Sequence, residues 1–191
     1  MKRIMLAVLL ATSVSATLSS AAEVEGVRLE ERVRGEGGQE LVLNGAGVRS
    51  KMFIKGYVGA LYLAQKNSSA AAVLADKGPK RVALHVLRDD VSADKMVSAL
   101  NEGLSDNNSR AEMAPLEARL KDFGAILGAA KSYKKGNAIA FDYLPGSGTR
   151  ITIDGQVKGT IPGDDFNHAL LKVWLGEKPV DGGLKKGMLG G

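Results

Sequence analysis

The sequence predicts an α+β fold built on an antiparallel sheet, and two observations carry this prediction. Segments with the two-residue period of strands come first, segments with the 3.6-residue period of helices follow, and this order of blocks then repeats. The strict alternation of single strands and single helices that is typical of parallel sheets is absent. At 191 residues without an internal repeat, the chain has the size of one domain.

The first block of predicted strands covers residues 27–34, 40–44, 49–63 and 81–87. Tyr, Val, Ile and Phe are enriched in residues 49–63, as is typical of strands. A Gly-rich stretch, residues 35–39, separates the first two segments and predicts a turn.

A helix is predicted over residues 91–104, where apolar residues recur every four positions from Met96 to Leu104. Either Asp90 or Ser92 is a suitable N-cap, because both side chains accept hydrogen bonds from free backbone N–H groups.

A second helix is predicted over residues 111–130, with one broad apolar face. The helix proper is expected to begin near Ala114, because Pro115 loses no hydrogen bond in a first turn.

The second strand block covers residues 138–143 and 150–161, and Asp154-Gly155 predicts a hairpin turn within the latter. A helix beginning at residues 163–165 follows, and a short final helix is predicted over residues 183–189.

The N-terminus has the order of a secretory signal: a basic start, an apolar run over residues 4–11, and small residues before Glu23. The apolar run is too short to span a bilayer, which takes about 20 residues. We therefore expect residues 1–22 to be a cleaved signal peptide, with a cut after Ala16 as the alternative. Residues 23–191 would then form one periplasmic or secreted domain without a stable membrane anchor.

Composition narrows the classes of function. The chain has no cysteine, which excludes disulfides, thiolate metal sites and a cysteine nucleophile. Because the signal segment holds Lys2 and Arg3 and no acidic residue, its removal lowers the net charge from +5 to +3. Such mild basicity favours small anionic ligands or lipid surfaces, and we expect no nucleic-acid partner.

The residues of common catalytic motifs have simpler interpretations here. His85 and His168 are too few for a metal site, and we expect neither a metal nor a cofactor. The pairs Asp89-Asp90 and Asp164-Asp165 precede predicted helices, where carboxylates cap N–H groups. Ser147 lacks the flanking glycines of a nucleophile elbow.

Arg49 is the first candidate for ligand binding, because a guanidinium beside an apolar pocket binds a carboxylate with two hydrogen bonds; the alternative is a surface ion pair. Tyr57 is a candidate second donor. Eight residues of straight strand span about 26 Å, so the two side chains share a ligand only if the chain folds back near residues 50–53. Asn101, at the edge of the apolar stripe of its helix, either lines a pocket or is solvated.

Several motifs in order resemble the chalcone isomerase-like family, most closely its exported bacterial branch. They are Asn44-Gly45-Ala46-Gly47-Val48-Arg49-Ser50-Lys51, Tyr57-Val58-Gly59-Ala60-Leu61-Tyr62-Leu63, Asp142-Tyr143-Leu144-Pro145-Gly146-Ser147-Gly148-Thr149, Ile161-Pro162-Gly163-Asp164-Asp165-Phe166 and Trp174-Leu175-Gly176-Glu177-Lys178-Pro179. The resemblance implies an open-faced β-sandwich, a large antiparallel sheet with helices packed on one side. The family holds plant flavonoid-cyclising enzymes, non-catalytic fatty-acid binders and bacterial members.

The resemblance also implies roles for single residues. Arg49 matches the Arg that the enzymes use near the substrate and that the fatty-acid binders use for the carboxylate. Tyr57 falls where the enzymes have Thr and the binders have Tyr. Residues 91–104, with Asp94, Lys95, Met96 and Asn101, do not reproduce the spacing of the enzymes' helix, and Val173 falls at the enzymes' late Thr.

From this pattern we expect a periplasmic protein that binds a fatty acid or similar carboxylate without catalysis, with Arg49, Tyr57 and Asn101 as binding residues and no catalytic residue. Two alternatives stay open: an intramolecular lyase resembling chalcone isomerase, and an envelope structural or interaction protein.

Overall fold

A computed structural model describes residues 21–35 and 38–191 of the chain. The predicted signal peptide therefore lies almost wholly outside the described residues, and only Ala21 and Ala22 fall within them, at the start of the first strand.

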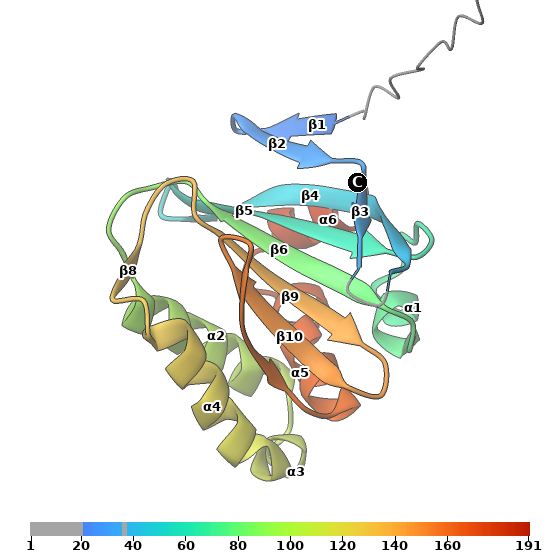
Figure 1. The fold of residues 1–191 in the computed structure, drawn as a ribbon, viewed down its shortest axis with the longest axis vertical. Coiled ribbons are helices and arrows are strands. Elements are labelled where there is room, and N and C mark those ends of the chain that lie inside the picture. The colour runs from blue at the N-terminus through green and yellow to red at the C-terminus, as the bar shows by residue number, and fades with distance from the viewer. Residues whose placement is uncertain (1–20, 36–37) are drawn as a thin grey trace, which may run out of the picture.

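The centre of the molecule is an antiparallel sheet of seven strands in the order β11-β10-β9-β6-β5-β4-β3 (Figure 1). These strands are β3 (Arg32–Arg34), β4 (Glu40–Lys51), β5 (Ile54–Leu63), β6 (Lys80–Val86), β9 (Ala138–Leu144), β10 (Gly148–Ile153) and β11 (Gln156–Ile161). Two short ribbons accompany it: β1 (Ala21–Val24) with β2 (Val27–Glu30), and β7 (Val91–Ser92) with β8 (Ser132–Tyr133).

The helices lie behind and beside the sheet, while the β1–β2 hairpin lies across part of its other face (Figure 1). They are α1 (Ala70–Ala75), α2 (Ala93–Asn107), α3 (Arg110–Met113), a 3₁₀ turn (Ala114–Leu116), α4 (Glu117–Gly128), α5 (Asp164–Leu175) and α6 (Gly182–Met188). The predicted α+β class is confirmed, as is the arrangement of one large antiparallel sheet with helices.

Alternation along the strands produces two apolar cores. On the helix face, Trp174, Phe123 and Phe166 pack against the sheet around Phe141. On the other face, a smaller cluster under the β1–β2 hairpin includes Leu29, Leu41, Val58 and Tyr62. Each face of the central strands is therefore partly buried, which explains why these strands contain so many consecutive apolar residues.

Two strand predictions are corrected. Residues 49–63 are not one strand, because the chain reverses at Met52 and Phe53 between β4 and β5. Residues 27–34 form two strands, because the chain passes from the small ribbon to the main sheet at Glu31, whose carbonyl accepts a hydrogen bond from Leu43 N.

The helix predictions need smaller changes. Ser92, and not Asp90, caps α2, since its hydroxyl accepts from Lys95 N. The predicted helix over residues 111–130 starts earlier, at Arg110, and is interrupted by the 3₁₀ turn that contains Pro115. Its main part, α4, therefore begins at Glu117 and not near Ala114. Helix α1 was not predicted, because six residues are too few to show a helical period.

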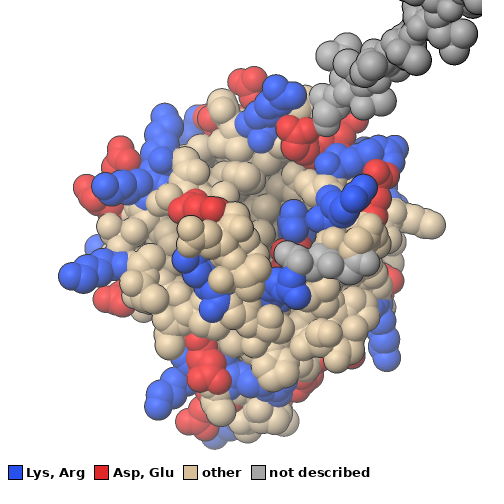
Figure 2. Space-filling view, viewed as in Figure 1, with Lys and Arg blue, Asp and Glu red and all other residues tan. Residues whose placement is uncertain are grey.

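Figure 2 shows that basic and acidic side chains are interspersed over the face in view, around a hollowed, mostly uncharged centre. This face of the described molecule has no extended basic surface of the kind that nucleic acid binds. No described helix has the length and hydropathy needed to cross a membrane.

Candidate functional site

The β4–β5 hairpin brings Arg49 and Tyr57 together. The tight turn at Met52 and Phe53 pairs Ser50 with Lys55, and a β-bulge at Gly56 then shifts the register by one residue, so that Arg49 pairs directly with Tyr57. Directly opposed residues in an antiparallel pair point to the same face of the sheet. The fold-back that a shared ligand requires is therefore present, and it lies within the predicted residues 50–53.

Both residues line one cavity of about 560 Å³ between this hairpin and helix α2. We call it the Arg49 cavity. Its wall includes apolar side chains from four parts of the chain, namely Tyr57, Leu84, Met96, Leu100 and Val180. Charged residues line it as well: Arg49, Lys51, Arg88 and Lys95 are basic, and Asp90 and Glu102 are acidic. The cavity thus combines an apolar wall with an excess of positive charge.

The guanidinium of Arg49 is the unusual group in this cavity. Its Nε is buried and has no hydrogen-bond partner. The structure gives the Arg49 side chain no ion pair with any described residue. A buried N–H without an acceptor costs free energy, so buried donors in proteins are almost always paired. An anionic ligand would supply the missing acceptor.

Tyr57 is held in a fixed orientation by Trp174, whose Nε1 donates to the Tyr57 hydroxyl oxygen at 3.0 Å. Burial raises the pKa of Tyr57 to about 12, although Trp174 and the charge of Arg49 act in the opposite direction. The hydroxyl therefore keeps its proton at neutral pH. Since the indole uses an oxygen lone pair, that proton remains available for a ligand beside Arg49.

Asp181 is the acidic group that would be expected to neutralise Arg49, because its charge is felt at Tyr57. Its carboxylate is engaged elsewhere. It accepts from Leu184 N at 2.9 Å, as the N-cap of α6, and from Ser50 N at 3.0 Å. Asp181 thus joins α6 to the end of β4 and leaves the guanidinium of Arg49 unpaired.

The structure does not place Asn101 in this cavity. Its side chain is exposed on α2, and Asn101 is absent from the lining residues. The cavity side of α2 instead presents Lys95, Ser98, Ala99 and Glu102. These lie three and four residues apart, as neighbours on one helix face do. That spacing is visible in the sequence, but it is interpretable only once the orientation of α2 is known.

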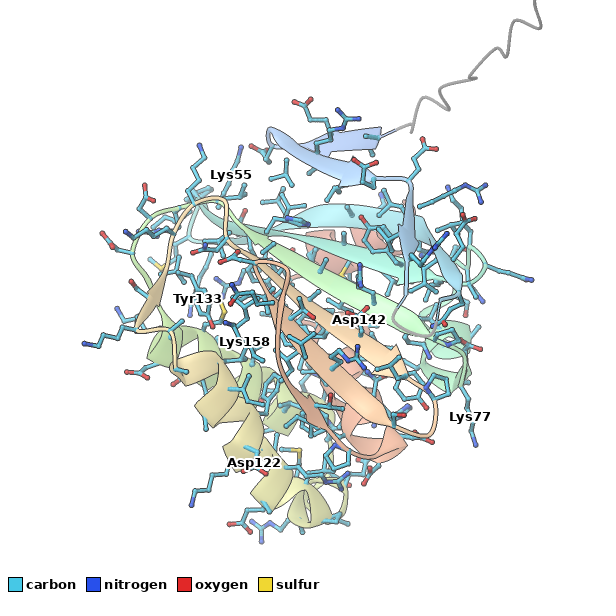
Figure 3. All side chains as sticks on the ribbon, in the orientation of Figure 1. Lys55, Lys77, Asp122, Tyr133, Asp142 and Lys158 are labelled. Atoms are coloured by element: carbon cyan, nitrogen blue, oxygen red, sulfur yellow. The ribbon has the colours of Figure 1, made fainter. Side chains whose placement is uncertain are left out.

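A second cavity, of about 470 Å³, lies between α1, α3, α5 and β9, and we call it the Lys80 cavity. Lys77, which lines it, and Lys55, in the hairpin of the Arg49 cavity, lie on opposite sides of the molecule in Figure 3. Lys80 is only 3% exposed, and burial lowers its pKa. Its ammonium nevertheless donates to Asp76 O at 2.7 Å and to Gly78 O at 2.8 Å.

Two further groups complete the surroundings of Lys80. The Asp76 carboxylate lies 3.5 Å from its Nζ, and the ring of Tyr143 lies beneath it at 4.8 Å. Burial, and then a hydrogen bond with Asp164, raise the pKa of Tyr143 to about 12. Every donor need of this buried cation is met within the protein, so the Lys80 cavity requires no external anion.

The remaining candidates have structural surroundings. His85 is half-buried in β6, and burial lowers its pKa. His168 Nδ1 lies 3.1 Å from Leu74 O. Asp165 binds Arg119 through both carboxylate oxygens, at 2.6 and 2.7 Å, which lowers its pKa. Within the described residues, no group of three His, Cys, Asp or Glu side chains is arranged to hold a metal ion.

The predicted capping roles of the aspartate pairs hold only in part. Asp164 and Asp165 lie in the first turn of α5, which begins after Gly163, and Asp165 accepts from Phe166 N. Asp89 instead accepts from Lys135 N, and Asp90 adopts a positive φ of 56° beside the Arg49 cavity.

Comparison with known proteins places this geometry in a family. The fold matches the crystal structure of a fatty-acid-binding protein of Arabidopsis thaliana with a TM-score of 0.69 at 13% identity, covering 89% of this chain and 96% of that one. No curated protein matches the chain. The family model described as chalcone isomerase-like matches residues 21–190. The chain therefore belongs to the chalcone isomerase-like family.

Proposed function

We propose that this protein is an exported, non-catalytic binder of a small amphipathic anion such as a fatty acid. The observation that carries the proposal is the buried, unpartnered Nε of Arg49 in a cavity with an apolar wall. A carboxylate supplies the acceptor that the protein lacks there, and an alkyl chain fits the apolar wall.

Arg49 and Tyr57 each donate a hydrogen bond to the ligand's carboxylate. Arg49 forms a charge-assisted hydrogen bond to the carboxylate, which is about twice as strong as a neutral one. Tyr57 donates a second hydrogen bond while Trp174 fixes its orientation. The volume of about 560 Å³ lies within the usual range of ligand pockets. The likeness to a protein named for fatty-acid binding supports the same ligand class.

The absence of catalysis is supported by the chemistry of the two donors. A general acid or base works best with a pKa near the working pH. Tyr57, with a pKa of about 12, stays protonated, and an arginine stays charged. The buried Val173, where the enzymes of the family carry a Thr, offers no hydroxyl.

Export is supported by the order of charge and hydropathy in residues 1–22. An envelope location would give the protein access to abundant lipid carboxylates, whereas flavonoid substrates have no evident supply there. The chemistry of the site and the signal-like residues 1–22 thus both favour a lipid carboxylate as the ligand.

Native mass spectrometry of the purified protein tests the proposal, with Arg49→Ala as the test variant and Arg88→Ala as the matched control on the same cavity. We expect a lipid carboxylate to co-purify with the wild type and with Arg88→Ala, and to be lost from Arg49→Ala. If no lipid co-purifies and Arg49→Ala binds added dodecanoate as well as the wild type, the proposal is wrong. Turnover of a chalcone that depends on Arg49 would instead support the lyase alternative.

A further inference from the structure

The tip of the β4–β5 hairpin exposes three consecutive large apolar side chains. Met52 is 83% exposed, Phe53 is fully exposed and Ile54 is 53% exposed. The one other exposed large apolar side chain in the described part of the molecule is Val157, at 55%. Single exposed apolar residues are normal on protein surfaces, but a contiguous group at a projecting turn indicates an interaction site.

The turn itself is not optimised for folding. Three two-residue hairpin turns in the described chain have both central residues at positive φ, and they are Glu25-Gly26, Met52-Phe53 and Asp154-Gly155. Such turns strongly prefer a glycine, often after Asn or Asp. Only the Met52-Phe53 turn has none, with φ values of 49° and 65°. Strain of this kind persists at functional sites, so folding does not explain Met and Phe here.

The charges around the tip are mainly positive, which favours an anionic partner. Lys51 and Lys55 flank the apolar residues directly, and Lys55 also binds Glu25 of the neighbouring hairpin. Arg88 and Lys95 stand across the adjacent cavity, where basic lining residues outnumber acidic ones by four to two. Exposed apolar side chains surrounded by cations match the interface of an anionic lipid bilayer.

The tip is also part of the cavity wall. Lys51, Met52 and Ile54 line the Arg49 cavity together with Arg49 itself. Whatever surface the tip enters therefore lies directly at the mouth of the cavity.

We propose that residues 51–55 form a membrane-docking tip, which inserts Met52, Phe53 and Ile54 into the interface of an anionic bilayer and holds the mouth of the Arg49 cavity against it. Docking depends on the tip and on the cations around it and not on a bound ligand; that the docked cavity then exchanges its ligand with the bilayer rests on the proposed function.

Vesicle flotation tests the docking. The purified protein is mixed with phosphatidylcholine vesicles that contain or lack phosphatidylglycerol, at low and high salt. We expect binding to the phosphatidylglycerol vesicles at low salt, and weaker binding at high salt or without the anionic lipid. Failure of the wild type to bind phosphatidylglycerol vesicles at low salt would overturn the proposal.

The double variant M52N/F53G supplies the sharpest comparison, because Asn-Gly suits this turn. It should unfold at the same temperature as the wild type or higher, while its vesicle partition coefficient falls about ten-fold or more. Val157→Ser, which removes the apolar side chain outside the tip, should bind as the wild type does. Wild-type binding by M52N/F53G would contradict the proposal, as would a wild-type dimer that this variant abolishes, since the tip would then serve a second copy.

Docking and ligand binding are separable in this design. Arg49→Ala should still float with the vesicles, with a partition coefficient lowered about five-fold at most by the loss of one cation, while losing dodecanoate. If the wild type binds dodecanoate but no vesicles, docking is wrong and the proposed function stands. If it binds vesicles but carries no co-purified lipid carboxylate and binds no dodecanoate, the proposed function is wrong and the docking stands.

Discussion

The two cavities differ in how the cation that lines each of them is paired. In the Lys80 cavity, the ammonium of Lys80 has two carbonyl acceptors, a nearby carboxylate and an aromatic ring. In the Arg49 cavity, the acid that would be expected to pair with Arg49 caps α6, and the guanidinium Nε has no partner. Cavity volume does not separate the two sites, but the charge of the lining does: basic residues outnumber acidic ones by four to two in the Arg49 cavity, whereas acidic residues outnumber basic ones by four to two in the Lys80 cavity.

Hydrogen-bond satisfaction also separates them. A buried cation whose donors are all used stabilises the fold and has little to offer a ligand, whereas a buried donor without an acceptor is costly until a ligand arrives. We therefore assign a structural role to Lys80 and propose a binding role for Arg49. The same substitution in both cavities should give opposite results.

Arg49→Met is expected to give the largest effect. Methionine keeps the unbranched aliphatic part of the arginine side chain but lacks the charge and the N–H donors. No described group uses those donors in a hydrogen bond or ion pair. Dodecanoate affinity should fall about 10- to 100-fold, as for the loss of a hydrogen bond to a charged group. Thermal unfolding should be unchanged or shifted upward. Calorimetric titration and a thermal scan measure the two quantities, and an unchanged affinity would remove the distinction between the cavities.

Lys80→Met should show the reverse behaviour. The carbonyls of Asp76 and Gly78 lose their donor, so we expect the free energy of unfolding to fall by about 1–2 kcal/mol. Dodecanoate affinity should stay at the wild-type value. Urea unfolding followed by circular dichroism measures the free energy of unfolding. A variant that loses affinity without losing stability would show that the Lys80 cavity is the ligand site.

Tyr57→Phe is expected to have a smaller effect. The Trp174 N–H loses its acceptor, so stability should drop by about 1 kcal/mol, and the loss of one neutral donor should weaken dodecanoate about two- to five-fold. Asn101→Ala, on the exposed side of α2, is the control and should change neither quantity. An equal loss of affinity in Asn101→Ala would place the ligand elsewhere on α2.

The pH dependence of binding should show no contribution from Tyr57. With a pKa of about 12, its hydroxyl keeps its proton where an ordinary tyrosine, with a pKa of 10.0, is half ionised. A phenolate would repel the bound anion, so a normal pKa would lower the affinity as the pH rises toward 10. We expect the wild type and Tyr57→Phe to have parallel affinity profiles between pH 8 and about 10. A fall confined to the wild type would mean that Tyr57 titrates normally.

Much of the fold was accessible from the sequence because it rests on local periodicity. The hairpin at Asp154-Gly155 and the helix that begins after Gly163 follow from short-range rules and were predicted correctly. The break at Glu31 and the turn at Met52-Phe53 were less accessible. The first depends on which sheet a strand joins, and the second uses residues that such turns rarely contain.

The candidate site was predictable only where one strand pair builds it. Arg49 and Tyr57 lie on adjacent strands, so a single turn and the β-bulge beside it, at Gly56, bring them together. Asn101 is solvated and does not line the cavity, because the rotation of α2 about its axis is set by packing of Met96 and Leu100 in the core. The unpaired state of Arg49 depends on Asp181, which lies 132 residues away in the chain and whose hydrogen bonds no sequence pattern reveals.

The most direct test of the central claim is to observe the Arg49 Nε–H group by ¹⁵N-resolved NMR while dodecanoate is added to the wild-type protein. Arg49→Met assigns the resonance. We predict that this signal moves downfield and saturates with the ligand, while the Lys80 side-chain signals stay in place. A saturating titration in which the Arg49 signal does not move, or in which the Lys80 signals move instead, would contradict the assignment of Arg49 as the ligand's anchor.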